Sequence, residues 1–178
     1  MIIMKTKILV AALLMLALPM TATNKKEQTK FAQQKQRLTG IWQQCFPIAT
    51  NDGGLQLRFT PHFKILGGDG SFNNMSQANS LAPAALFATG EWRVTSDSTF
   101  VEHLTTIATD DKSEGKDNEL TFRLEADDNI LEVSYTMPSD TRRLREVWIR
   151  VQKGNAIEVA QKYFQGRNKQ KQNTIKSF

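Results

Sequence analysis

The segment LTGIWQQC, residues 38–45, places a glycine two positions before a tryptophan where the first ordered strand is expected. Residues two positions apart on a strand face the same side of the sheet, so Gly40 and Trp42 share one face. Glycine has no Cβ, which lets an indole or another backbone approach closely. A similar trio, TGEW, recurs at 89–92. The pattern predicts a strand on which the glycine lets another group approach the face that carries the tryptophan.

Short strands joined by tight turns account for the rest of the central sequence. Period-two alternation and turn residues predict eight strands, at 38–46, 55–66, 71–76, 88–95, 99–109, 119–125, 130–136 and 144–151. Pro61 lies inside the second strand, where proline indicates a bulge that helps a sheet to curl. Antiparallel strands in chain order close most economically as an up-and-down barrel. We therefore predict an all-β fold with a barrel over residues 38–151.

The alternation also assigns faces to several strands. Apolar residues at every second position share one side, and these sets are Phe63 and Ile65; Gly90, Trp92 and Val94; Leu120, Phe122 and Leu124; and Leu131, Val133, Tyr135 and Met137. Polar residues lie between them, and Glu132 is expected to point outward. The last strand is apolar in both phases, so its facing is not assigned and a cover on both sides is expected.

A helix is predicted after the last strand, at residues 154–166. Asn155 and Glu158 form a capping-box pattern, and Gly166 marks the C-terminal end. Its apolar stripe consists of Ala156, Ile157, Ala160, Tyr163 and Phe164. We expect the helix to pack against the outside of the barrel and residues 167–178 to form a disordered tail.

The N-terminus has the pattern of an export signal. Lys5 and Lys7 precede an unbroken apolar run of 11 residues, 8–18, which is followed by Pro19 and small residues. This order is typical of a secretory signal peptide, and the run is too short for a transmembrane helix. We predict a signal peptide at 1–22, no integral membrane segment after its removal, and a mature protein in the periplasm or extracellular space.

The net charge of +5 is unevenly distributed. The polar N-terminal segment 23–37 has five basic residues and one acidic residue, 152–178 has six and one, and the body 38–151 has 10 basic and 16 acidic residues. Nucleic-acid binders place basic residues on the folded surface among aromatic side chains. We therefore expect no nucleic-acid partner. The basic ends are interpreted as solvated flexible tails, with attraction to anionic lipid or polysaccharide as the alternative.

The sequence contains no recognised catalytic or metal-binding motif. His62 and His103 lack the spacing of a zinc site, and the acidic loop 110–119 does not fit an EF-hand. Cys45 is the single cysteine, so no internal disulfide forms, and a small buried strand residue is expected there. We predict no catalytic residue, no metal, no cofactor and no enzyme activity.

Two carboxylates within strands, Glu102 and Glu146, are expected to point inward near Arg150. A buried carboxylate needs a cationic partner or takes a raised pKa. We interpret these residues as an ion pair that supports the structure or orients a ligand, in preference to acid–base catalysis.

Three positions and four short segments carry a family resemblance. Gly40, Trp42 and Arg150 match the pattern of the lipocalins and related calycin barrels, in which a basic residue on the last strand stacks over the Gly-x-Trp tryptophan. The chain also resembles a family of exported bacterial lipocalin-like proteins of unknown function, at LTGIWQQC, KILGGDGSFNNM, TSDSTFVEH and EVWIRV. The resemblance implies the fold, export and a structural plug at one barrel end, but no activity.

Two classes of function remain open. The first is a carrier or sensor of a small apolar or amphipathic molecule, for which the expected ligand-binding residues are Trp92, Phe100, Glu102, Phe122, Tyr135 and Trp148. The apolar segment 76–89 is then either a lid or a loop or short helix packed over a barrel end. The second is a cell-envelope module with a filled barrel that binds a protein or glycan. An interior of several hundred Å³ would favour the carrier.

Overall fold

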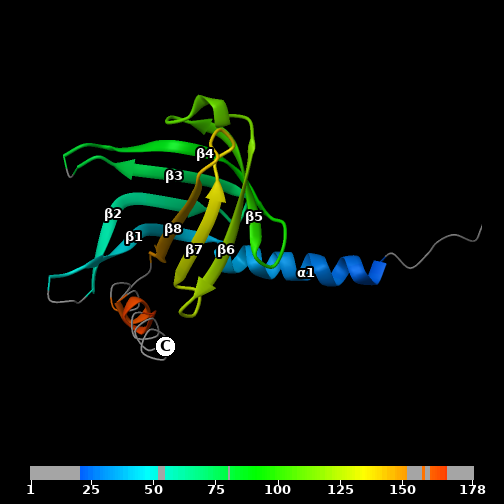
Figure 1. Cartoon of the computed structure of the whole chain (residues 1–178). Coiled ribbons are helices and arrows are strands. Elements are labelled where there is room, and N and C mark those ends of the chain that lie inside the picture. The colour runs from blue at the N-terminus through cyan, green and yellow to red at the C-terminus, as the bar shows by residue number, and fades with distance from the viewer. Residues whose placement is uncertain (1–20, 52–54, 80, 152–157, 159–160, 168–178) are drawn as a thin grey trace, which may run out of the picture.

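The computed structural model describes residues 21–51, 55–79, 81–151, 158 and 161–167. Its strands are β1 (Gly40–Ala49), β2 (Leu55–Leu66), β3 (Ser71–Gln77), β4 (Ala84–Val94), β5 (Thr99–Ile107), β6 (Asp117–Glu125), β7 (Ile130–Thr136) and β8 (Arg143–Arg150). Each strand pairs antiparallel with its neighbours in the chain, and β1 also pairs with β8, which closes the barrel (Figure 1). The predicted eight-stranded antiparallel barrel is therefore confirmed.

The two ends of the barrel differ in how they are covered. We call the end that carries Leu38, Gly40 and Arg150 the base, and the opposite end, with the β5–β6 and β7–β8 connections, the mouth. A helix, α1 (Thr21–Leu38), leads into β1 and runs away from the base (Figure 1). Its last residue, Leu38, is fully buried in the barrel core. The base is thus closed by the chain segment that enters the barrel.

The sequence predicts a solvated flexible tail at 23–37, and this prediction is wrong because the structure has the helix α1 there. Its sequence is mostly polar and shows no apolar stripe, which removes the usual helix signal. The helix is held at its C-terminal end, where the Arg37 guanidinium pairs with Asp128 at 2.6 Å. The Lys35 ammonium lies 5.7 Å from the centre of the Trp92 ring.

The predicted bulge at Pro61 is confirmed by the pairing of β1 with β2. Gln43 lies opposite Phe63, but Cys45, two residues on, lies opposite Phe59. The β2 segment between these two partners, which contains Pro61, is therefore longer than the β1 segment it faces. Such an extra length bends one strand relative to its neighbour and helps the sheet to close.

The segment 76–89 is not the long connector that the sequence suggested. Residues 76–77 end β3 and residues 84–89 begin β4, so the two strands form a long hairpin. Leu81 at its tip is 94% exposed and Leu86 is 57% exposed. The apolar run that suggested a lid is largely strand.

The interior and exterior of the barrel have separate hydrophobic clusters. The interior cluster includes Trp42, Phe72, Trp92, Phe100 and Trp148. The exterior cluster consists of Cys45, Ile130, Ile149 and Phe164, with Tyr163 packed against it. The two faces of β8 are therefore both covered, as expected, with Trp148 inside and Ile149 outside.

The C-terminal helix lies against the outside of the barrel at residues 161–167. The Tyr163 hydroxyl donates a hydrogen bond of 2.5 Å to Glu132 of β7, which points outward as predicted. Arg167, expected at the start of the disordered tail, belongs to this helix and also contacts Glu132. The remaining tail, 168–178, lies outside the described residues.

Most of the predicted signal peptide, residues 1–20, likewise lies outside the described part of the chain. Among the described residues, no helix combines the length and apolar character needed to cross a membrane.

Candidate functional site

The base of the barrel is sealed by an indole under a guanidinium. Trp42 is fully buried, and the Arg150 guanidinium carbon lies 4.0 Å from the centre of its ring. The Trp42 indole N–H donates to the Leu38 carbonyl at 2.9 Å. A cation over a tryptophan face contributes about 0.5–2 kcal/mol. The structure thus brings together Gly40, Trp42 and Arg150, the three residues of the Gly-x-Trp and basic-residue pattern.

Arg150 also ties the base to the chain around it. Its Nε donates to the Asp128 carbonyl at 2.9 Å and its Nη1 to the Thr39 carbonyl at 2.8 Å. Burial lowers the pKa of Arg150 from its ordinary value. A Cβ on Gly40 would lie 2.6 Å from Arg150 Nη1, so the glycine makes room for the guanidinium.

The second Gly-x-Trp trio also belongs to the base. A Cβ on Gly90 would lie 1.9 Å from the His103 carbonyl oxygen, so this glycine lets β4 and β5 approach closely. The Trp92 indole donates to the Gly67 carbonyl at 2.9 Å, and its ring packs edge-on against Phe100 at 6.0 Å between centroids. The Phe100 ring in turn packs against Phe122, with 5.8 Å between centroids.

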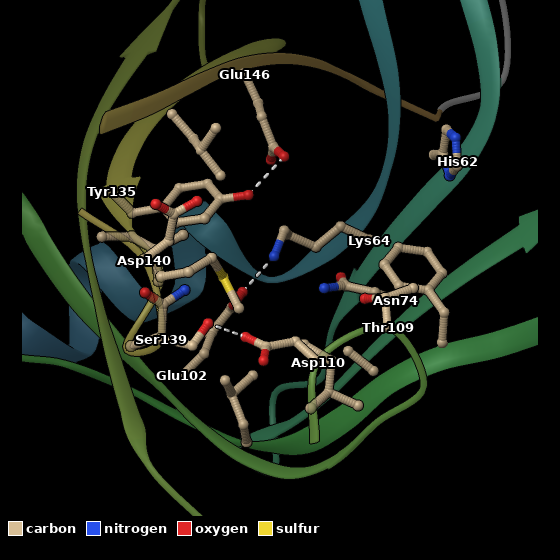
Figure 2. A pocket seen from close by; sticks show the side chains of 18 of the residues that line it. His62, Lys64, Asn74, Glu102, Thr109, Asp110, Tyr135, Ser139, Asp140 and Glu146 are labelled. Carbon is tan, nitrogen blue, oxygen red and sulfur yellow. Dashed lines mark hydrogen bonds and ion pairs between the residues drawn. The ribbon is translucent and has the colours of Figure 1, made fainter. Parts of the chain in front are cut away.

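The mouth half of the barrel holds a cavity of about 500 Å³, seen from close by in Figure 2. Its wall is apolar at Phe87, Leu104, Ile107, Met137 and Leu144. The polar side chains that line it include Lys64, Asn74, Glu102, Asn118, Tyr135 and Glu146. The cavity therefore combines an apolar wall with convergent polar groups, as small-molecule sites do.

A buried ion pair crosses the interior between the base and the cavity. Lys64 of β2 bonds to Glu102 of β5, and each side chain is only 3% exposed (Figure 2). Lys64 lies opposite Trp42 in the β1–β2 register, and Glu102 lies opposite Trp92 in the β4–β5 register. Because a lone buried charge is costly, each residue needs the other. The pair forms the floor of the cavity.

Glu146 is held on the cavity wall by neutral donors. The Tyr135 hydroxyl donates to its Oε1 at 2.8 Å, and the Trp148 indole donates to its Oε2 at 3.0 Å. Burial and the neighbouring Glu146 carboxylate raise the pKa of Tyr135 above its ordinary value. Tyr135 therefore stays protonated and remains a donor at neutral pH.

Two asparagines that line the cavity each have a buried amide oxygen with no hydrogen-bond partner among the described residues. The two oxygens are Asn74 Oδ1 and Asn118 Oδ1. The whole Asn118 residue is only 3% exposed. A buried acceptor without a partner costs about 1–3 kcal/mol, so each oxygen is a place where a bound donor would gain.

The mouth carries a second set of polar contacts. Asp110 accepts hydrogen bonds from the hydroxyls of Ser113 and Ser139, which lower its pKa. Asp140 pairs with Arg142 at 2.6 Å, and that arginine side chain is 80% exposed. Asp110, at the start of the acidic loop 110–119, thus lies at the rim of the cavity.

The predicted ligand-binding residues divide between the two halves of the barrel. Glu102, Tyr135 and Trp148 line the cavity, whereas Trp92, Phe100 and Phe122 pack in the core nearer the base. Sequence reasoning missed Lys64, Asn74 and Asn118, which also line the cavity. On β2, the sequence pattern selects Phe63 and Ile65, which lie on the face opposite to Lys64. The one sequence signal for this part of the site is Lys64 itself, because it is a charged residue inside an apolar run.

The expected approach of the two carboxylates to Arg150 is wrong. Both Glu102 and Glu146 point into the barrel, but the partner of Glu102 is Lys64, and Arg150 lies over Trp42 at the base. Arg150 ends β8 at the base, whereas Glu146 lies four residues earlier on the way to the mouth. The length of the strand separates them.

The two histidines and the cysteine lie apart from one another. His62 lines the cavity with its ring edge-on to Phe87, and His103 bonds to Asp117 at 2.8 Å. Burial raises the pKa of the Cys45 thiol to about 11, so it stays protonated at neutral pH. Within the described residues, no three histidine, cysteine or acidic side chains are grouped closely enough to hold a metal ion.

Comparison with known proteins places this barrel in a family. Residues 37–158 match the model of a family described as a domain of unknown function, DUF4488. No curated protein matches the chain. The matched residues contain all eight strands, the base and the cavity. Because the match spans more than half of the chain, the protein belongs to the DUF4488 family.

Proposed function

We propose that this protein is a lipocalin-like binding protein that holds one small amphipathic molecule in the mouth half of its barrel. The observation that carries the proposal is the cavity of about 500 Å³. Small-molecule sites usually range from about 300 to 1,000 Å³. An eight-stranded barrel is wide enough either to be filled by side chains or to hold one small ligand.

The distribution of side chains supports a binding role over that of a filled interaction module. Packing of large aromatic side chains fills the base, where Trp42 and Phe100 are fully buried. Above the Lys64–Glu102 pair, the interior remains open and is lined by both apolar and polar groups. A module that used only its outer surface would have no need for this open half.

The amphipathic character of the ligand follows from the lining. Leu104, Ile107 and Met137 offer apolar contact, and Glu146 and the two unpaired asparagine oxygens offer hydrogen-bond acceptors. A purely apolar molecule would leave those acceptors unpaired. A molecule with one polar end satisfies them and still buries its apolar part.

We also propose that the protein is exported and acts outside the cytoplasm. The order of Lys5, Lys7, the apolar run 8–18 and the small residues after it supports this location. The mass of the mature protein isolated from its host would test it, because signal-peptide removal near Ala22 would shorten the chain. A mature chain that begins at Met1 would contradict export by this route.

Native mass spectrometry of the protein purified from its own host tests the binding function. We expect a non-covalent mass in the range of a small amphiphile on the wild-type protein. Ala88 lines the cavity and is 3% exposed, so Ala88→Phe should fill the space and remove the bound mass. Ala84 lies on the same strand and is exposed, so Ala84→Phe is the matched control.

Thermal unfolding followed by circular dichroism shows whether each variant is folded. Retention of the mass by folded Ala88→Phe would place the molecule elsewhere. A wild-type protein that carries no bound mass in repeated preparations, and that binds no added amphiphile, would contradict the proposed function.

A further inference from the structure

The charges that line the cavity are not balanced. Four carboxylates line it, at Glu102, Asp110, Asp140 and Glu146, against two permanent cations, Lys64 and Arg142. Lys64 neutralises Glu102, and Arg142 neutralises Asp140. The two remaining carboxylates have no cationic partner within ion-pair distance among the described residues. The cavity therefore carries an excess of negative charge.

Glu146 is the better placed of these two carboxylates to meet a ligand. It lies on β8 inside the barrel, where it accepts a hydrogen bond from Tyr135 (Figure 2). Its second donor is the Trp148 indole, and both donors are neutral. Asp110 lies on a connection at the mouth and is held by the hydroxyls of two serines. A carboxylate bonded only to neutral donors gains further from a cation, because charge-assisted hydrogen bonds are about twice as strong as neutral ones.

The unpaired amide oxygens are an independent observation that points to a donor. Asn118 lines the cavity and is nine-tenths buried or more, and its buried Oδ1 has no partner among the described residues. Asn74 presents a second such oxygen from β3. In the register, Asn74 lies opposite Lys64 and Asn118 opposite Glu102, so both amides flank the ion pair of the floor.

We propose that the molecule bound in the cavity carries a protonated amine, which enters first and is held by the Glu146 carboxylate and the amide oxygens of Asn74 and Asn118. This inference rests on the proposed binding function and specifies the chemical class of the ligand. An ammonium group has three donors and no acceptor, so it matches a site whose unmet groups are acceptors. The apolar part of the ligand then lies toward the mouth, along Phe87, Met137 and Leu144.

An anionic head group fits this site less well. A fatty carboxylate would need a cation that is not already paired, but the Lys64 ammonium is bonded to Glu102. Arg142 is 80% exposed at the mouth and is paired with Asp140. A carboxylate in the interior would also face the like charge of Glu146, which disfavours it. The lining thus discriminates between amphiphiles of the same length by the charge of their heads.

Three probes with the same ten-carbon chain test the inference: decylamine, decanol and decanoate. We would titrate each probe into the purified protein at pH 7 and measure Kd by isothermal titration calorimetry. Each probe is kept below the concentration at which it aggregates. A charge-assisted hydrogen bond in place of a neutral one is expected to favour decylamine over decanol by about tenfold. Decanoate should bind more weakly than decanol.

A matched pair of variants locates the head group. Glu146→Gln removes the charge with little change in shape, and it should weaken decylamine binding about tenfold while leaving decanol binding nearly unchanged. Glu119 is exposed on the outer face of β6, next in sequence to Asn118, and Glu119→Gln is the control. If the Glu146→Gln variant is too unstable to assay, Asn118→Leu takes its place. By the same reasoning, it should weaken decylamine binding more than decanol binding.

The outcomes separate this inference from the function on which it rests. Equal or tighter binding of decanol or decanoate, or equal losses for decylamine and decanol in Glu146→Gln, would overturn the ammonium assignment and leave the binding function standing. Failure of all three probes to bind, together with a protein free of any bound mass from its host, would overturn the binding function itself.

Discussion

The base and the mouth of this barrel are built from the same strands but are packed in opposite ways. At the base, Trp42 and Trp92 are buried and each indole N–H has a backbone carbonyl as acceptor. In the mouth half, Asn74 and Asn118 have buried oxygens without partners among the described residues, beside a cavity of about 500 Å³. The difference shows that side chains fill one half of the interior and leave the other half open, and this open half is where we propose that the ligand binds.

The change from one half to the other occurs within single strands. On several strands, an apolar inward side chain of the core is followed, two residues closer to the mouth, by a polar inward side chain. The pairs are Leu66 and Lys64, Phe72 and Asn74, Phe100 and Glu102, Leu120 and Asn118, and Trp148 and Glu146. Five strands change character at this boundary. We therefore expect substitutions on the base side of this boundary to change stability, and substitutions on the mouth side to change binding.

Trp42→Ala should give one of the two largest losses of stability. The side chain is fully buried and stacks under Arg150, so its removal leaves a cavity and an uncovered guanidinium. We expect a decrease of about 3–5 kcal/mol in the free energy of unfolding, measured by urea denaturation. Phe46→Ala on the same strand, where the side chain is 41% exposed, should cost much less. Similar losses for the two variants would contradict the closed base.

Lys64→Met tests the boundary itself. The substitution leaves Glu102 buried without its cation, which should lower the free energy of unfolding by about 3–5 kcal/mol. The double variant Lys64→Met with Glu102→Leu should recover much of that loss, because an apolar pair of similar size needs no ion pair. Lys116→Met, at an exposed position, is the control. Additive losses in the double variant would show that the two residues are not coupled.

Gly90→Ala should also act on the base. Its Cβ would lie 1.9 Å from the His103 carbonyl oxygen, so the paired strands β4 and β5 would have to separate. We expect a loss of about 1–3 kcal/mol, the usual effect of overpacking, in the same denaturation assay. Gly166→Ala is the matched control, because nothing lies within 4 Å of its added carbon. No change in Gly90→Ala would mean that the strands are less closely packed here.

Acid should weaken the outer face of the barrel where the C-terminal helix lies. Burial alone would raise the pKa of Glu132, but hydrogen bonds from Tyr163, Arg145 and Arg123 outweigh it and lower the pKa to about 2. The stabilisation is therefore present above the unfolded pKa near 4.5 and is lost as the pH falls through about 2.

The arginines around Glu132 are partly exposed, so we expect a contribution of about 1–2 kcal/mol after screening by solvent. Urea denaturation of wild type and Glu132→Gln between pH 2 and pH 6 measures it. The difference between the two should shrink as the pH falls below about 4.5, and a constant difference would contradict the assigned pKa.

The sequence predicts the fold well because the signals for strands and turns are local. Alternation on most strands, together with turn residues, predicts the eight strands that the structure shows, and Pro61 predicts the bulge. The same local pattern predicts most residues of the apolar half of the interior. The sequence does not predict the cavity floor, because Lys64 points inward between the outward Phe63 and Ile65 and so inverts the usual alternation.

Partners of buried polar groups depend on distances across the barrel. Lys64 and Glu102 lie 38 residues apart in the chain, and no local pattern joins them. The same limit applies to α1, whose mostly polar sequence is held at the base by tertiary contacts of Arg37 and Leu38. Sequence reasoning therefore recovers the scaffold more readily than the site.

The base of the barrel is filled, and we propose that the mouth half receives the ligand. The three tryptophans of the chain report on this difference directly. The indole N–H groups of Trp42 and Trp92 lie in the base, whereas that of Trp148 donates to Glu146 on the cavity wall. We would titrate decylamine, and then decanol, into nitrogen-15-labelled protein and follow the three indole signals by NMR. We expect the Trp148 signal to move while the other two stay in place. Movement of the Trp42 or Trp92 signals with Trp148 unmoved would contradict it.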